Sequence, residues 1–250
     1  MDVMAWFGIY TKEHAPAKTW SAEADCAVRA AIRLWEATGE EACAAYAVAW
    51  ADSLMAADAC VPACSRALFF ALAKTGEEKY RDAIRQVMAD LGRNPGAEPL
   101  DVHALCAELP FRMAYEMKLG GMEKVGLCAG KFRESCAALR DAATGLVSGN
   151  VTDSVRVLLA LADAIDVCSD QLYEHWRAMV DIFRSLLRSV LTANAHVQGE
   201  TAAMLSAAMY DGVRMNLIDP ERYLPLVDEY LAVSGLAQAA AVLKMEGGAL

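Results

Sequence analysis

A repeated helix–glycine–helix unit restricts the fold of this chain more than any other feature of the sequence. The motifs Thr38-Gly39-Glu40-Glu41 and Thr75-Gly76-Glu77-Glu78 lie 37 residues apart, each between two apolar periodic segments. Glycine readily ends a helix, and acidic residues favour the first turn of the next one. The motif therefore indicates an internal repeat of helical hairpins.

More hairpins follow along the chain. Residues 101–132 form an apolar helix containing Pro110, a break at Gly120-Gly121, and a second helix that opens on Met122-Glu123-Lys124. A proline in a first helical turn loses no internal hydrogen bond, so Pro220 marks another helix start. Further helices are expected at about 21–38, from 40, at 152–167, from near 170, at 199–216 and, as a short eleventh helix, at 236–245.

Two kinds of helix alternate in this pattern. Residues 152–167 and 199–216 are apolar nearly all round, whereas the helices that open on paired acidic residues carry one charged face. A helix that is apolar on every side must be buried on every side. Five hairpins of this kind predict either a right-handed solenoid, the usual arrangement of such repeats, or a ring with the apolar helices inside. Variable repeat lengths and polar groups at the entrances of the inner helices favour the ring.

Composition limits the class of protein. The chain has 250 residues with 56% hydrophobic residues and no linker-like stretch, so we expect one all-α domain over 1–250 with an irregular segment at 1–20. A formal charge of −10 argues against a nucleic-acid partner. No apolar run reaches about 18 residues and no signal peptide is evident, which predicts a soluble, cytoplasmic protein without a membrane partner.

Eight cysteines are scattered along the chain, mostly on apolar helical faces. Cysteine used in this way is a small hydrophobic residue in a reducing compartment. Cys60 and Cys64 lie one turn apart and could share a metal ion, but no histidine or second cysteine pair is nearby. Core packing is therefore the favoured interpretation, and no metal site is predicted.

Three ordered patterns resemble glycoside hydrolase families 88 and 105, the unsaturated glucuronyl and rhamnogalacturonyl hydrolases. They are ALAKTGEEKYRDAI at 71–84, ELPFRMAYEMKLGGMEK at 108–124 and GETAAMLSAAMYDGVRMNLIDPERYLPL at 199–226. The resemblance covers roughly residues 22–233. It implies an (α/α)6 barrel, here about eleven helices and incomplete relative to the family because the chain ends before the family's last repeat.

The reaction that the resemblance implies is hydration of the C4–C5 double bond of an unsaturated uronic acid. An aspartic acid protonates the double bond, water adds at C5, and the resulting hemiketal opens to release the sugar, without a metal or organic cofactor. Alignment on the Pro110-Phe111 pair puts His103 where that aspartic acid should stand. The family's WgRGnGW motif falls on residues 150–156, which contain neither tryptophan nor glycine.

Four residues are the candidates for a site. Asp58 and His103 are the predicted acid/base pair, although Asp58 would also suit a helix N-cap and a lone histidine on an apolar helix is commonly a core residue. Glu200 and Thr201 match the family's Glu-Thr-Ser start and are predicted to bind substrate, with a capped helix N-terminus as the alternative.

The departures at His103 and 150–156 lead to two main hypotheses. The first is a protein that resembles the unsaturated uronyl hydrolases and has weakened or lost activity towards small acidic oligosaccharides. The second is a non-catalytic carbohydrate-binding or protein-interaction scaffold of helices. Either protein could form a homo-oligomer.

Overall fold

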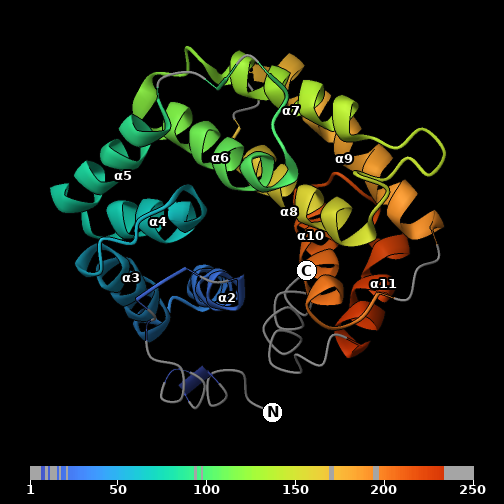
Figure 1. Cartoon of the computed structure of the whole chain (residues 1–250). Coiled ribbons are helices and arrows are strands. Elements are labelled where there is room, and N and C mark those ends of the chain that lie inside the picture. The colour runs from blue at the N-terminus through green and yellow to red at the C-terminus, as the bar shows by residue number, and fades with distance from the viewer. Residues whose placement is uncertain are drawn as a thin grey trace. The chain divides into compact units, whose positions relative to one another are not determined.

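The computed structural model describes residues 7–8, 11, 16, 18–20, 22–92, 95–96, 98–168, 172–193 and 197–233. These residues contain ten α-helices, one short 3-10 helix, one π-helix and no strand (Figure 1). They divide into two compact units, which meet in sequence between Asp90 and Leu91. Each unit is described separately.

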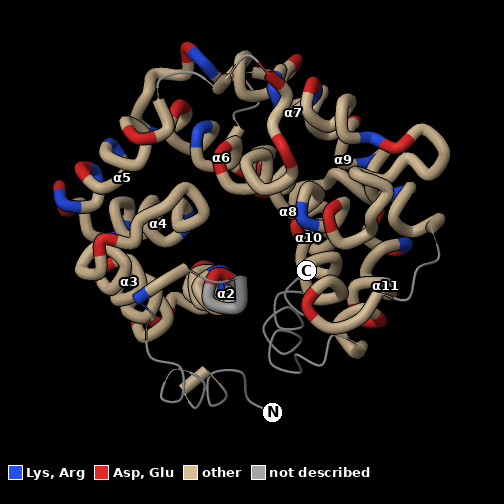
Figure 2. The backbone as a smooth tube through the Cα atoms, in the orientation of Figure 1, with Lys and Arg blue, Asp and Glu red and all other residues tan. Residues whose placement is uncertain are grey.

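The described residues of unit 1 contain four α-helices and the 3-10 helix. These are α2 (Ala22–Thr38), α3 (Glu41–Ala56), η1 (Pro62–Cys64), α4 (Ser65–Thr75) and α5 (Glu78–Leu91), the last residue of α5 already belonging to unit 2. Helices α2, α3 and α4 pack against one another. The core between them is fully apolar at Leu34, Ala47, Trp50, Leu54 and Leu68. Helix α5 buries Tyr80 and Ile84, whereas its charged residues Asp82, Arg85 and Asp90 are exposed. Figure 2 marks the charged positions along this helix in blue and red.

The two Thr-Gly-Glu motifs form the same turn. In the first, Thr38 Oγ1 donates to Leu34 O (2.6 Å) and accepts from the Glu40 amide (3.2 Å). In the second, Thr75 Oγ1 donates to Ala71 O (2.8 Å) and accepts from the Glu77 amide (3.1 Å). The intervening glycines have φ values of 72° and 71°. The predicted repeat is thus confirmed down to its hydrogen bonds.

We expect Gly76→Ala to lower the free energy of unfolding by about 1 kcal/mol, because an L-residue is strained at a positive φ. A Cβ at Gly76 would meet nothing within 4 Å, so strain of the backbone is the whole effect. Gly130→Ala is the matched control: that glycine lies inside a helix, also in open space, and alanine there should raise stability by about 0.5–1 kcal/mol. Urea unfolding of both variants provides the measurement, and equal shifts would contradict the explanation.

Unit 2 is a two-layered arrangement of three helical hairpins. It contains α6 (Val102–Tyr115), the π-helix η2 (Glu116–Gly120), α7 (Val125–Leu139), α8 (Val151–Val167), α9 (Tyr173–Thr192), α10 (Gly199–Arg214) and α11 (Pro220–Val233). Helix α8 packs between α6 and α10, and these three make one layer (Figure 1). Helices α7, α9 and α11 make the second layer, each packed on the first.

The inner layer is buried as the sequence pattern predicted. Helix α8 buries nine of its residues: Ser154, Val155, Val157, Leu158, Ala160, Leu161, Ala162, Ala164 and Ile165. Helix α10 buries eleven, including the small residues Ala202, Ala208 and Gly212. A Cβ at Gly212 would lie 3.1 Å from the Phe183 ring, which shows how closely α9 packs on α10.

One segment of unit 2 differs from the expectation. The helix after the Gly120-Gly121 break begins at Val125 instead of Met122, because the preceding helix ends in the π-helix and a turn. The buried Glu116 carboxylate fills this wide turn, where its Oε2 accepts the Lys124 amide (3.3 Å). A Cβ at Gly120 would stand 2.8 Å from that oxygen, so a side chain at this position would displace the Glu116 carboxylate. The expected eleventh helix at 236–245 and most of the segment 1–20 lie outside the described residues.

Candidate functional site

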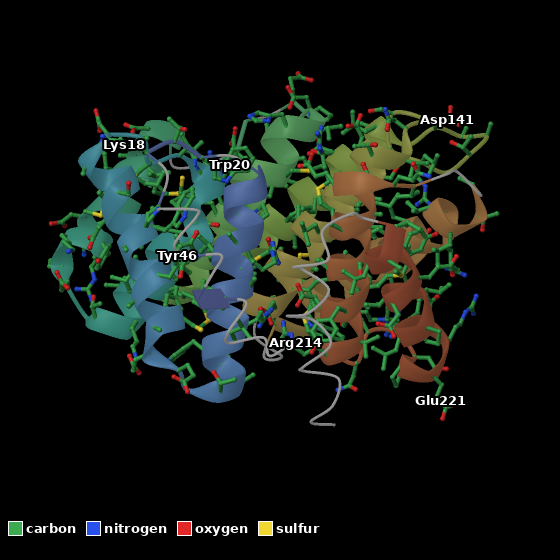
Figure 3. The ribbon with its side chains drawn as sticks, turned by 90° about the horizontal axis from the view of Figure 1, so that it is seen from below. Lys18, Trp20, Tyr46, Asp141, Arg214 and Glu221 are labelled. Atoms are coloured by element: carbon green, nitrogen blue, oxygen red, sulfur yellow. The ribbon has the colours of Figure 1, made fainter. Side chains whose placement is uncertain are left out.

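The inner helices of unit 2 begin at the same end of the unit. Thr152 Oγ1 in the first turn of α8 lies 3.2 Å from Thr201 Oγ1 in the first turn of α10. Figure 3 shows Asp141, which precedes α8, near one end of the unit and Arg214, the last residue of α10, towards the other. The first turns of α8 and α10, which are far apart in the sequence, are therefore neighbours in space.

Asn150 and Ser154 form the start of α8. The Asn150 side chain accepts hydrogen bonds from the amides of Thr152 (2.8 Å) and Asp153 (3.3 Å), the usual role of an N-cap. The fully buried Ser154 hydroxyl donates to Asn150 O (2.7 Å) and accepts the Val147 amide (2.9 Å). The residues that begin α8 are thereby held in a defined position.

His103 lies in the first turn of α6. This helix is capped by Asp101, whose Oδ1 accepts the Ala104 amide (2.8 Å). The loop before it is fastened to α7 by the hydrogen bond from the Leu100 amide to Ser135 Oγ (2.9 Å). The His103 side chain is exposed, so the interpretation as a core histidine is wrong. An imidazole at a helix start and open to solvent remains available to a ligand.

One turn further along α6, Cys106 faces the beginning of α8. Burial raises the pKa of its thiol to about 12, Cys136 and Asp153 add smaller upward effects, and Arg156 on α8 lowers it. The charges of Arg156 and Asp153 thus act on the Cys106 thiol across the packed helices α6 and α8. We call the four residues His103, Cys106, Asp153 and Arg156 the α6–α8 wall.

Glu200 and Thr201 open α10 as the sequence predicted, but neither caps it. The helix begins at Gly199, the N-cap position is Gln198, and no side chain caps the helix there. Glu200 is exposed, and Thr201 uses its hydroxyl for the hydrogen bond to Thr152. The interpretation of these two residues as caps is therefore wrong.

Asp58 belongs to unit 1. It occupies the turn between α3 and η1 with φ of 50°, and its side chain is exposed. The N-cap position of η1 is Val61, and no side chain caps that helix, so the interpretation of Asp58 as an N-cap is wrong. The structure brings the start of α10, with Glu200 and Thr201, next to the start of α8, and α6, which carries His103, packs on α8. Asp58 is described within the other unit.

Arg156 and Cys106 are the residues that sequence reasoning did not select. Arg156 is 52% exposed on a helix that is otherwise mostly buried. A charged residue in a nearly apolar inner helix was a usable signal in the sequence. The influence of Arg156 on Cys106 had no signal in the sequence, because it depends on the packing of two helices that are about fifty residues apart.

The cysteines are mostly buried, as expected for core residues. Among those whose side chains are described, Cys43, Cys64, Cys128, Cys136 and Cys168 are buried. Burial is the main cause that raises their thiol pKa, to about 11 in Cys64 and about 12 in Cys136. The described residues contain no group of three or more His, Cys, Asp or Glu side chains placed to hold a metal ion.

The raised thiol pKa values predict that stability falls at alkaline pH. Unfolded thiols lose their protons near pH 8.5, whereas the folded chain keeps them up to pH 11–12, so the unfolded state binds fewer protons in between. The stability that the protonated thiols give the folded state is fully present below about pH 8.5 and is lost progressively as the pH rises above that value. The melting temperature of the wild type minus that of a Cys106→Ala/Cys136→Ala variant should decrease as pH rises above that value. A difference that stays constant from neutral to strongly alkaline pH would contradict the prediction.

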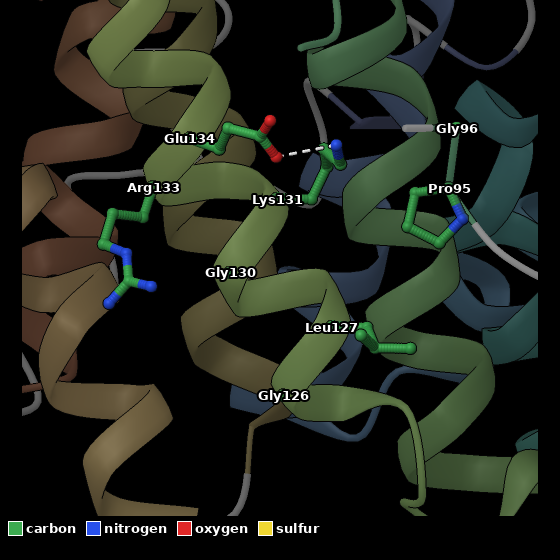
Figure 4. A pocket seen from close by; sticks show the side chains of 8 residues that line it. All are labelled: Pro95, Gly96, Gly126, Leu127, Gly130, Lys131, Arg133 and Glu134. Atoms are coloured by element: carbon green, nitrogen blue, oxygen red, sulfur yellow. Dashed lines mark hydrogen bonds and ion pairs between the residues drawn. The ribbon is translucent and has the colours of Figure 1, made fainter. Parts of the chain in front are cut away.

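A shallow pocket lies elsewhere on unit 2, between α7 and the loop before α6 (Figure 4). Gly126, Leu127 and Gly130 line its helical side. Its buried lysine, Lys131, is held by Glu134 (2.7 Å) and by Glu98 O (3.3 Å). None of the predicted site residues lines it.

The fold defined by these helices is that of the (α/α)6-barrel glycoside hydrolases of families 105 and 88, which confirms the all-α fold expected from the sequence. The family 105 glycoside hydrolase of C. acetobutylicum is similar over 93% of this chain and 82% of its own, with a TM-score of 0.77 and 15% identity.

Two further solved structures share the fold. A polysaccharide lyase covers 92% of this chain and 82% of its own (TM-score 0.69, 16% identity). A family 88 glycosyl hydrolase from Bacteroides vulgatus covers 92% and 84% (TM-score 0.67, 13% identity). No protein-family model and no curated protein matches the sequence. None of the described helices is long and apolar enough to cross a bilayer.

Proposed function

We propose that this chain binds small acidic oligosaccharides at the starts of α6, α8 and α10 and retains a weakened unsaturated uronyl hydrolase activity. The observation that supports the proposal is the meeting of polar side chains at the starts of α8 and α10, beside which α6 packs on α8, in a fold shared with glycoside hydrolases. These helices are otherwise buried, so their open ends are where they meet solvent.

The proposed chemistry assigns roles to the candidate residues of unit 2. Hydration of a vinyl ether requires a group that gives a proton to the double bond and a group that assists the attacking water. We assign proton donation to His103, because a histidine can give and take a proton near neutral pH. Asp58, the other predicted catalytic residue, belongs to unit 1 and is given no part in this site. Glu200 and Thr201 would contact sugar hydroxyls. A histidine in place of a carboxylic acid is the reason we expect weak activity.

The test is incubation with an unsaturated glucuronyl or galacturonyl disaccharide while the ultraviolet absorbance of its double bond is followed. We expect slow loss of absorbance with the wild type and none with His103→Ala. His103→Asp supplies a carboxylic acid at the same position and should raise the rate. No loss with either the wild type or His103→Asp, at high protein concentration, would contradict the hydrolase activity.

A non-catalytic binding protein is the second candidate. The absence of tryptophan and glycine at residues 150–156 favours it, because these residues depart most from the hydrolase pattern. A binding protein would be stabilised by the disaccharide without consuming it. Thermal unfolding with and without the ligand, combined with the absorbance assay, separates the two candidates.

A further inference from the structure

Many basic side chains of this chain pair with carboxylates. In unit 1, for example, Lys74 bonds to Glu41 (2.7 Å) and Arg81 to Glu78 (2.8 Å). Such pairing is expected in a protein with a formal charge of −10, because acidic residues are in excess. A group of arginines without carboxylate partners is therefore an exception that calls for a reason.

Three such arginines lie in the layer of unit 2 that contains α7, α9 and α11. Arg140 directly follows α7, and Arg184 and Arg188 belong to α9. All three side chains are exposed. None of them forms an ion pair with a carboxylate of the described residues.

Arg140 is held against α9 by two hydroxyl groups. Its Nη2 donates to Ser185 Oγ (2.8 Å) and to Ser189 Oγ (3.3 Å). The loop after Arg140 packs closely on this contact, because a Cβ at Gly145 would lie 2.7 Å from Ser189 Oγ. The Nε and Nη1 groups of Arg140 and the hydroxyl hydrogen of Ser185 have no acceptor among the described residues, so they remain donors for a ligand.

The two arginines of α9 are fixed in a similar way. Arg184 Nε donates to Leu217 O (2.6 Å), in the loop between α10 and α11, and Arg188 Nε donates to Arg184 O (3.4 Å). Their terminal nitrogens donate to no residue that the structure describes. A guanidinium that is already fixed through one nitrogen loses less conformational entropy when it binds a ligand.

These side chains start from neighbouring positions on α9. Residues three or four positions apart on a helix are surface neighbours, with Cβ atoms about 5–6 Å apart. Arg184 and Arg188 are four positions apart, and Ser185, which holds Arg140, comes three before Arg188. We call Arg140, Arg184, Ser185 and Arg188 the α9 arginine cluster. It places three positive charges around little more than one turn of helix.

The carboxylates nearest to this cluster in sequence do not neutralise it. Asp141 accepts both the amide and the hydroxyl of Thr144 within its own turn, each at 2.8 Å. Asp219 accepts the Glu221 amide (3.0 Å) at the start of α11. Asp181, on α9, is exposed and forms no ion pair with a described residue. The cluster is thus a local cationic surface on an acidic protein.

We propose that the α9 arginine cluster binds a phosphate monoester or inorganic phosphate. Guanidinium and hydroxyl donors that meet at one place suit a group with three or more acceptor oxygens and nearly two negative charges. A sulfate ester carries a single charge and matches the three cations less well. The cluster belongs to a different layer from the inner helices, and the inference does not depend on the proposed function.

The experiment is titration calorimetry at neutral pH and constant ionic strength, which keeps the screening of charges equal. The ligands are inorganic phosphate, a hexose phosphate and the hexose sulfate with its ester at the same carbon. The proteins are the wild type, Arg188→Met, Arg188→Lys and Arg177→Met. Arg177 is the matched control, an exposed arginine of the same helix outside the cluster.

Arg188 is the position of choice because its one hydrogen bond within the described protein is the long one to Arg184 O. Its replacement should leave the fold intact, and melting temperatures of all four proteins verify this. We expect Arg188→Met to weaken binding of the hexose phosphate by about 10- to 100-fold. Arg188→Lys should fall between, because an ammonium keeps the charge but not the planar donors. Arg177→Met should bind as the wild type does, and the hexose sulfate should bind more weakly than the phosphate.

The comparison of the two phosphates identifies the source of the group. Tighter binding of the hexose phosphate would show that the sugar contributes, and tighter binding of inorganic phosphate would show that the free ion is the ligand; both results support the site. The inference is overturned if the folded wild type binds neither phosphate at millimolar concentration. It is equally overturned if Arg188→Met and Arg177→Met weaken binding to the same degree, since the attraction would then be diffuse, or if the hexose sulfate binds as tightly as the phosphate. None of these outcomes bears on the disaccharide assay of the proposed function.

Discussion

Arg112→Met is expected to lower the free energy of unfolding by about 2–4 kcal/mol, the largest stability effect that we foresee for a polar residue of this chain. The side chain is 2% exposed, and its two terminal nitrogens donate to Gly92 O and Leu91 O. Methionine fills much of the same volume but donates nothing, so two carbonyls lose their partner away from water. Urea unfolding followed by circular dichroism measures the shift.

The matched control is Arg177→Met, whose exposed arginine should change stability by less than about 0.5 kcal/mol. Arg112→Lys keeps the charge and one donor group, and we expect an intermediate loss. The Nε atom of Arg112 has no hydrogen-bond partner, which methionine would relieve, and this moderates the expected loss. Equal unfolding midpoints for Arg112→Met and Arg177→Met would show that the buried guanidinium does not hold these carbonyls.

Ser154→Ala is expected to lower stability by about 2 kcal/mol and also to weaken saccharide binding. Its hydroxyl accepts the Val147 amide and donates to Asn150 O, and both groups are left without that partner in the variant. Because these bonds position the first turns of α8, the geometry of Thr152, Asp153 and Arg156 should loosen as well. Unfolding and titration calorimetry on the same preparation measure the two effects.

Ser206→Ala is the appropriate comparison. Ser206 is an equally buried serine on the neighbouring inner helix, where it makes a single hydrogen bond to Val227 O (2.9 Å) and lies far along α10 from its start. Its loss should cost about 1 kcal/mol without an effect on binding. If Ser206→Ala weakens binding as much as Ser154→Ala does, the explanation through the start of α8 is wrong.

The helical hairpins were predictable because their determinants are local. Each Thr-Gly-Glu turn contains its own acceptor, its own left-handed residue and its own acidic helix start within four residues. Pro220 marks the beginning of α11 for an equally local reason. The burial of α8 and α10 followed from their composition, since a helix without a polar face cannot remain at a surface.

The candidate site was predictable only in part. His103 was selected by alignment, but its exposure in the first turn of α6, which Asp101 caps, could not be predicted from the apolar pattern of this helix. The N-cap interpretation of Asp58 was wrong because α3 ends in a turn closed by the bond from the Ala59 amide to Leu54 O, which places Asp58 before the next helix start and not at it. The wall that contains Arg156 requires the long-range pairing of α6 with α8, which no local pattern specifies.

The identical turns at Gly39 and Gly76 have a consequence for how the chain folds. All of their hydrogen bonds join residues at most four positions apart. The loop entropy for closing such turns is small, so the packed pair α2–α3 and the turn between α4 and α5 can form before distant parts of the chain have met. On a ribosome each pair would be complete soon after its second helix emerges, which limits the time for which its apolar faces are open to aggregation.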